Sequence, residues 1–158
     1  MRLRRLLGAV LAVLLWTESA AARDLAAVVN RANRAQDLTM PDLVKIFKGQ
    51  TSRWPDGKPV TVVIPDPGLP EMKLALEKIY GMSKEDLRTL MVKVNHDRGD
   101  RPVIVVADSD DDLVKRVESA PGAVALVDVY SITSGVSVVK IDGKLPLEPG
   151  YALHGNSR

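Results

Sequence analysis

The chain has no cysteine, which excludes disulfide bonds, a cysteine nucleophile and lipoprotein processing. Aromatic residues make up only 4% of the sequence, so a folded core must be built mainly from aliphatic side chains. The apolar run at residues 6–16 is too short to span a bilayer comfortably. These absences favour a globular domain whose own core holds it together.

Motifs that carry catalysis are also missing. The sequence has no Gly-x-Ser-x-Gly elbow, no Walker loop and no Gly-x-Gly-x-x-Gly turn. His96 and His154 lie far apart in sequence, which does not predict a metal site. The acidic run at residues 108–112 lacks the glycine and terminal glutamate of a calcium loop. We therefore predict a protein that is not an enzyme and that needs no cofactor and no metal.

The first 22 residues have the pattern of a secretory signal peptide. Arg2, Arg4 and Arg5 precede the apolar run, and Ala20 and Ala22 supply the small residues that a signal peptidase requires. Cleavage near Ala22 would leave residues 23–158, a single domain of 136 residues in the periplasm or outside the cell. The alternative is an uncleaved N-terminal anchor. In either case we expect the chain to contact a membrane only through this segment.

Charge gives no sign of a polyanionic partner. Of the 22 basic and 20 acidic residues, residues 1–22 hold three and one, so residues 23–158 carry 19 of each. The pI near 8.9 therefore owes much to the signal segment. A balanced domain of this kind does not predict binding to nucleic acid or to an anionic membrane.

Apolar runs alternate with amphipathic segments along residues 23–158. The run at 25–30 predicts a strand, and Thr39 with Pro41 predicts a capped helix that ends at Gly49. The remaining order is strand, helix, helix, strand, helix, strand, strand, over segments near 59–65, 70–81, 83–95, 103–109, 109–122, 123–129 and 136–143. Ser83 and Ser109 are the predicted caps of the helices that begin there. This order predicts a single three-layer α/β domain with a mixed, mostly parallel sheet and helices on both faces.

Trp54 stands in a polar turn between the first helix and the second strand. Pro55, Asp56 and Gly57 after it are strong turn formers. We expect the indole ring to cover the helix end near Ile46 or Phe47 and to anchor the turn. A stacking platform for a ligand is the alternative.

Several segments together resemble the type 2 periplasmic binding proteins of phosphate importers. The longest is LTMPDLVKIFKGQTSRWPDGKPVTVV at residues 38–63, where a capped helix ends in Ile-Phe-x-Gly before a Trp-bearing turn and a strand. The segments at 25–30, 81–94, 119–129 and 136–153 are also similar to the family, in the same order. The resemblance covers residues 25–153 and implies one lobe of a solute-binding protein.

The loop that holds the anion in that family is altered here. Its members carry Arg-x-Asp-Gly-Ser-Gly-Thr after the strand that matches residues 60–64, whereas this chain has IPDPGLPEMK at 64–73. Asp66 and Gly68 remain, but the arginine and hydroxyl donors do not, and three prolines lack N–H groups. The loop still offers the N–H groups of Gly68 and Leu69, while Asp66 would repel a dianion.

The resemblance implies a ligand site at the carboxyl ends of the strands. The candidate residues follow two predicted strands or lie at the turn before another: Asn30, Asn33, Asp66, Gly68, Leu69, Gly122 and Ala123. The first hypothesis is an exported module that binds a small phosphate-like anion and serves an ABC transporter. The second is an envelope interaction or structural module that has lost ligand binding, working with another envelope protein or as a homodimer.

Overall fold

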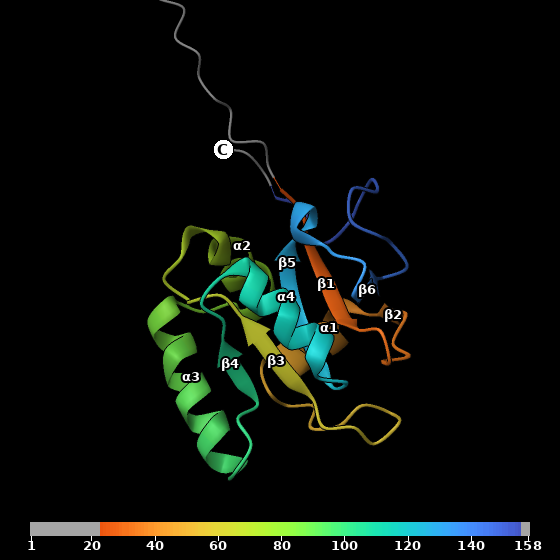
Figure 1. The fold of residues 1–158 in the computed structure, drawn as a ribbon. Helices are drawn as coiled ribbons and strands as arrows, with labels where there is room; N and C mark the ends of the chain where they lie inside the picture. Colours follow the sequence, from red (N-terminus) through yellow and green to blue (C-terminus); the bar gives the residue numbers. More distant parts are fainter. Residues whose placement is uncertain (1–22, 156–158) are drawn as a thin grey trace, which may run out of the picture.

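A computed structural model describes residues 23–155. Its main sheet has five strands in the order β4–β3–β5–β1–β6, formed by Ile104–Val106, Thr61–Ile64, Ala123–Asp128, Leu25–Asn30 and Val136–Val138. β3 runs parallel to β4 and to β5. A small parallel pair, β2 (Asp37–Leu38) with β7 (Lys140–Ile141), lies beside β1 and β6 (Figure 1). The α/β class and the strand order along the chain are as the sequence predicts.

Helices cover both faces of the sheet. α1 (Met40–Phe47), α2 (Lys73–Ala75) with its flanking turns, and α3 (Lys84–Asp97) lie on one side, and α4 (Asp110–Ser119) lies on the other (Figure 1). Alternate residues of a strand point to opposite faces of the sheet. Because helices cover both faces, the residues on both are apolar. Along β1, Leu25, Ala27 and Val29 join the larger core, while Ala26 and Val28 join the core under α4. The predicted three-layer arrangement is therefore confirmed.

The three long helices begin at the side chains that the sequence marks. Thr39, Ser83 and Ser109 each accept a hydrogen bond from the backbone N–H three residues on. These caps satisfy N–H groups that a helix leaves without partners in its first turn. Pro41 lies in the first turn of α1, where its missing N–H costs nothing.

The segment at residues 70–80 changes pitch along its length. A 3₁₀ turn, η1 (Pro70–Met72), leads into α2, and a π turn, η2 (Leu76–Tyr80), closes the segment at Gly81. Gly81 adopts φ +60°, the left-handed conformation that ends helices at low cost. The sequence predicts an ordinary helix here, and the structure differs in its pitch. π turns are uncommon and often adjoin functional sites.

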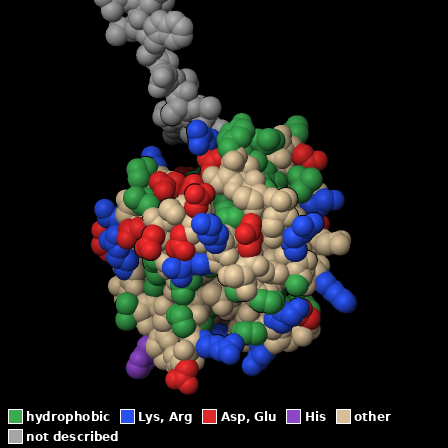
Figure 2. Space-filling view, viewed as in Figure 1, with side chains coloured by type: hydrophobic (Ala, Val, Ile, Leu, Met, Phe, Trp, Pro, Cys, Tyr) green, Lys and Arg blue, Asp and Glu red, His purple; other side chains and the backbone are tan. Residues whose placement is uncertain are grey.

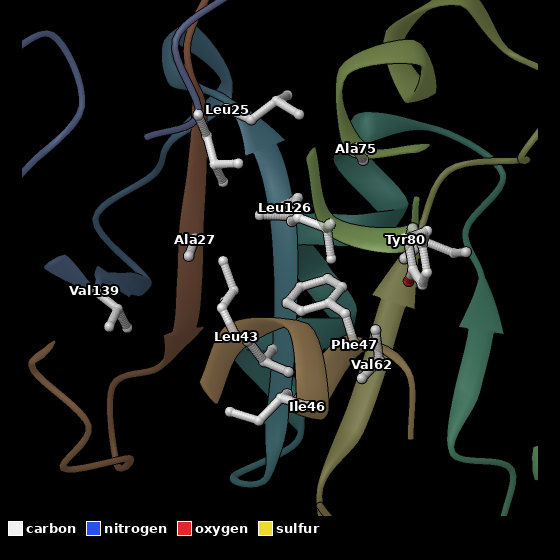
Figure 3. Packing of buried hydrophobic residues seen from close by; sticks show 14 of the residues in the cluster. Leu25, Ala27, Leu43, Ile46, Phe47, Val62, Ala75, Tyr80, Leu126 and Val139 are labelled. Atoms are coloured by element: carbon white, nitrogen blue, oxygen red, sulfur yellow. The ribbon is translucent and has the colours of Figure 1, made fainter. Parts of the chain in front are cut away.

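Aliphatic and aromatic side chains fill the larger core. Phe47 at the end of α1 packs edge-on against Tyr80, with ring centroids 6.4 Å apart (Figure 3). Leu43 and Leu126 close the space between α1 and the sheet. Burial raises the pKa of the Tyr80 hydroxyl well above its usual range. Within residues 23–155, no helix is long and apolar enough to cross a membrane.

The direction of β1 separates the predicted site residues. β1 pairs antiparallel with both β5 and β6, and Leu25 lies opposite Asp128 while Val29 lies opposite Val124. We call the edge where β3, β4 and β5 end the carboxyl edge, and the opposite one the amino edge. Asn30 ends β1 at the amino edge, because β1 points the other way. The expectation that all seven candidates share the carboxyl edge is therefore wrong.

Candidate ligand-binding site

The amino edge is built around Trp54. Its indole is 5% exposed, and Nε1 donates to the Gly122 carbonyl at 2.9 Å. Gly122 also packs so closely on the backbone of Pro59 that a Cβ atom would lie 1.8 Å from the Pro59 carbonyl oxygen. The Trp54 ring joins the core cluster that includes Ile46 and Phe47. This arrangement supports the role of Trp54 as a turn anchor, because its ring is not open to a ligand.

The two asparagines near β1 serve the backbone. Asn30 is buried, and its Nδ2 donates to the carbonyls of Val117 and Glu118 at 2.8 Å each, at the end of α4. Its Oδ1 accepts from the N–H of Ala32. Asn33 Oδ1 accepts from the N–H of Ala35, while its buried Nδ2 has no partner among residues 23–155. Asn30 therefore fixes α4 against the end of β1.

The loop after β3 has used the donors that an anion would need. The Gly68 N–H donates to Asp66 Oδ1 at 2.7 Å, and the Leu69 N–H donates to the Asp66 carbonyl at 3.0 Å. Arg88 Nη2 donates to the same Asp66 oxygen at 2.9 Å. The Gly68 N–H, followed by the Arg88 guanidinium, holds the pKa of Asp66 below its usual range. The expectation that Gly68 and Leu69 offer free N–H groups to a ligand is wrong for this conformation.

A cavity of about 880 Å³ opens at the carboxyl edge, between the helical segment 70–78 and the ends of β1 and β5. We call it the edge cavity. Buried apolar residues line its base: Leu25, Met72, Ala75, Leu126 and Val127. Charged or titratable residues from five parts of the chain surround them: Arg23, Glu71, Lys73, Glu77, Lys78, Asp110, Asp128 and His154. Its volume lies in the range of small-molecule sites.

A second cavity of about 670 Å³ lies on the far side of segment 70–78. Gly68 and Leu69 line it, and Pro70, Lys73 and Glu77 line both cavities. No residue of the sheet contributes to it. The edge cavity is the stronger candidate site, because strand ends and a buried apolar base support it.

His154 is held at the edge cavity by a buried carboxylate. Asp24 is 1% exposed, its Oδ1 lies 2.6 Å from His154 Nδ1, and its Oδ2 accepts from the Leu147 N–H at 2.7 Å. The imidazole itself stays 59% exposed. Nearby, Arg23 Nη1 bonds Asp128 Oδ2 at 3.2 Å. Sequence reasoning missed this pair because Asp24 and His154 are 130 positions apart.

The predicted candidates therefore fall into two groups. Asp66, Gly68 and Leu69 lie in the loop beside the carboxyl edge, although none lines the edge cavity. Asn30, Asn33, Gly122 and Ala123 lie at the amino edge, where Asn30 and Gly122 make structural contacts. All the residues that line the edge cavity come from outside the predicted set. The strand Leu25–Asn30 and the Pro-Gly turn were visible in the sequence, but the direction of β1 was not.

Exposed apolar side chains also gather near the carboxyl edge. Tyr130 is 75% exposed and Leu147 is 65% exposed, and the Arg23 guanidinium lies 5.7 Å from the centre of the Tyr130 ring. Leu147 has φ +71°, a left-handed conformation that is costly for leucine. Figure 2 shows hydrophobic side chains at this end of the molecule, beside the start of the described chain.

Solved structures share this architecture. A phosphate transport receptor from Vibrio cholerae aligns with a TM-score of 0.64 at 20% identity, over 79% of this chain and 48% of its own. A phosphate ABC transporter substrate-binding protein from Clostridium perfringens, solved with bound phosphate, gives 0.62 at 21% identity over 77% and 46%. A phosphate-binding protein from Stenotrophomonas maltophilia gives 0.62 at 18% identity over 79% and 40%.

The fold is that of one lobe of a type 2 periplasmic binding protein. The chain spans about half the length of the solved structures that it matches. No protein-family model and no curated protein sequence matches it. The resemblance predicted from the sequence is confirmed at the level of the fold.

Proposed function

We propose that residues 23–158 form an exported, single-lobe solute-binding module that holds a small molecule in the edge cavity. The observation that carries this proposal is the position of the cavity at the carboxyl ends of β3 and β5, where open α/β sheets bind ligands. The π turn at residues 76–80 supports it, because Ala75, Glu77 and Lys78 beside or within that turn line the cavity. Export follows from the predicted cleavage near Ala22.

Phosphate is the first ligand to test, because the matched solved structures include a substrate-binding protein with bound phosphate and a phosphate-binding protein. The loop at residues 65–69 argues against a grip of that kind, since Asp66 occupies its donors. An importer that accepts the solute is the partner that this function implies. Affinity in the millimolar range is expected for phosphate in a half-open site of one lobe.

Calorimetric titration of residues 23–158 with phosphate, and separately with sulfate, tests solute binding. Leu74 lines the edge cavity and packs against the larger core while only partly buried, so Leu74→Trp should fill the space, and circular dichroism checks that the variant stays folded. Val92→Trp on α3 is the matched control, because Val92 is 73% exposed and lines neither cavity. Binding that survives Leu74→Trp unchanged contradicts the placement in the edge cavity.

A second candidate function is docking to an envelope protein or to a second copy. The specific observation in its favour is the exposure of Tyr130 and Leu147 beside the carboxyl edge. Light scattering after size-exclusion chromatography separates monomer from dimer. A dimer that Tyr130→Ser converts to monomer would favour this candidate, and a monomer at all concentrations would remove the homodimer.

A further inference from the structure

We propose that the edge cavity takes an organic oxyanion, a carboxylate or a phosphate monoester with an apolar body, and that His154 and Arg23 bind its head group. This inference rests on the proposed solute-binding function and adds the chemical class of the ligand. It also moves the anion contact away from the loop at residues 65–69. The fold buries the Asp24 carboxylate at this edge, beside the exposed ring of His154.

Asp24 fixes the orientation of the His154 ring. One carboxylate oxygen lies 2.6 Å from Nδ1, and the other accepts the Leu147 N–H, so the carboxylate is held on both sides. A carboxylate beside Nδ1 requires a proton on that nitrogen, and Nε2 is then left for a contact outside the pair. Nε2 can donate a hydrogen bond to an anionic oxygen only when it carries a proton as well as Nδ1. Burying the Asp24 carboxylate has a desolvation cost. We infer that this cost is retained because the carboxylate orients the imidazole for a ligand.

Arg23 supplies the second donor group at the same place. A Cβ atom at Gly155 would lie 2.4 Å from the Arg23 carbonyl oxygen, so the residue after His154 packs directly on Arg23. The guanidinium has five N–H donors, and Nη1 donates one hydrogen bond, to Asp128. Cleavage after Ala22 would add an α-ammonium group to Arg23 itself, which would increase the positive charge at this position.

Hydrogen bonds engage two of the acidic residues around the cavity, although its four carboxylates outnumber the three cations Arg23, Lys73 and Lys78. Asp128 accepts from Arg23 and from the Tyr130 N–H, and Asp110 accepts from the Ser131 hydroxyl. The remaining carboxylates, Glu71 and Glu77, lie on the opposite helical wall together with Lys73 and Lys78. Among the described residues, the Arg23 guanidinium keeps N–H donors beyond its bond to Asp128, so an anion would be held there by hydrogen bonds and not by a net positive charge.

The lining of the cavity explains why the ligand needs an apolar body. Leu25, Met72 and Leu126 are already buried beneath the cavity, and the apolar surface that stays open in its lining comes from Pro65, Pro70 and Leu74. An inorganic phosphate ion at His154 would leave this apolar surface in water. A ligand that covers it gains hydrophobic free energy in proportion to the area removed from water.

The test is calorimetric titration of residues 23–158 with phenyl phosphate and with benzoate, which carry two different head groups on the same apolar ring. Inorganic phosphate supplies the head group without the body, and phenol supplies the body without the charge. At least one of the ring-bearing anions should bind about tenfold or more tightly than phosphate and than phenol. His154→Ala should weaken that anion about tenfold or more, as loss of a hydrogen bond to a charged group requires.

Matched variants separate this inference from the solute-binding proposal. Lys115→Met removes a cation from the exposed face of α4 and should leave affinity unchanged. Asp24→Asn keeps the shape beside His154 but removes the charge, so affinity should fall while circular dichroism still reports a folded chain. The ¹⁵N shift of the His154 ring should move on titration in the unmodified protein and not in Asp24→Asn at the same ligand concentration.

The possible outcomes are distinguishable. Binding that Leu74→Trp abolishes but His154→Ala leaves unchanged overturns the head-group assignment and keeps the solute-binding site. Binding that Leu74→Trp leaves unchanged overturns the site itself. Equal affinity for phosphate and the ring-bearing anions, or no binding of either ring-bearing anion, overturns the proposed ligand class.

Discussion

The two edges of the sheet differ in how their polar groups are satisfied. At the amino edge, the Trp54 indole and the Asn30 amide donate hydrogen bonds to backbone carbonyls of other segments. Gly122 packs against the Pro59 backbone without space for a side chain. At the carboxyl edge, His154 and Arg23 keep donors or acceptors beyond their internal bonds. The saturated bonding of Trp54 and Asn30 indicates a structural junction around these two side chains, and spare bonding capacity beside a cavity indicates a place for a ligand.

This comparison predicts that an aromatic residue contributes much to the free energy of unfolding at the amino edge and little near the carboxyl edge. Trp54→Ala removes a buried indole and should lower the free energy of unfolding by about 3–5 kcal/mol. Tyr130→Ala, its counterpart near the carboxyl edge, removes a ring that is 75% exposed and should change stability by less than about 0.5 kcal/mol. Urea unfolding followed by circular dichroism measures both, and similar values for the two variants would break the comparison.

Two glycines give the next largest contrast. Gly122→Ala would place a methyl group 1.8 Å from the Pro59 carbonyl oxygen, a backbone atom that cannot rotate away. We expect a loss of about 3 kcal/mol, at the upper end of overpacking costs. Gly68→Ala meets the Arg88 guanidinium at 2.9 Å, and that flexible side chain can move. Thermal unfolding should show a large fall for the first variant and a small one for the second.

Part of this arrangement can be predicted from the sequence. Thr39, Ser83 and Ser109 mark helix starts because a cap depends on residues only three positions away, and all three caps are confirmed. The Trp54 turn is also local. The direction of β1 is not local: it depends on pairing with β5, nearly a hundred positions later. The Asp24–His154 pair depends on where the tail returns, so no local pattern could indicate it.

Asn30 tests whether the amino edge is a structural junction. Asn30→Ala leaves the Val117 and Glu118 carbonyls at the end of α4 without their donor, and should cost about 2 kcal/mol. Asn33→Ala is the control, because its Nδ2 has no partner within residues 23–155 and only one bond, to the Ala35 N–H, is lost. Hydrogen exchange of α4 amides should accelerate in the first variant alone. Equal acceleration in both would show that Asn30 has no special role there.

The smallest expected effect concerns Asp66. Its carboxylate is exposed and accepts hydrogen bonds from the Gly68 N–H and the Arg88 guanidinium. The Gly68 N–H and the Arg88 guanidinium lower its pKa, so the charged carboxylate stabilises the folded state. That contribution is complete above the ordinary value of 3.8 and is lost as the pH falls through the lower pKa of the folded state. Asp66→Asn should therefore be slightly less stable than the unmodified chain at neutral pH, and the two should converge as the pH falls below that value. Asp111→Asn on the exposed first turn of α4 is a control for a generic acidic residue. A difference between Asp66→Asn and the unmodified chain that persists unchanged at low pH would mean that the carboxylate charge does not hold this loop, and the Gly68 and Leu69 N–H groups would again be candidates for an anion.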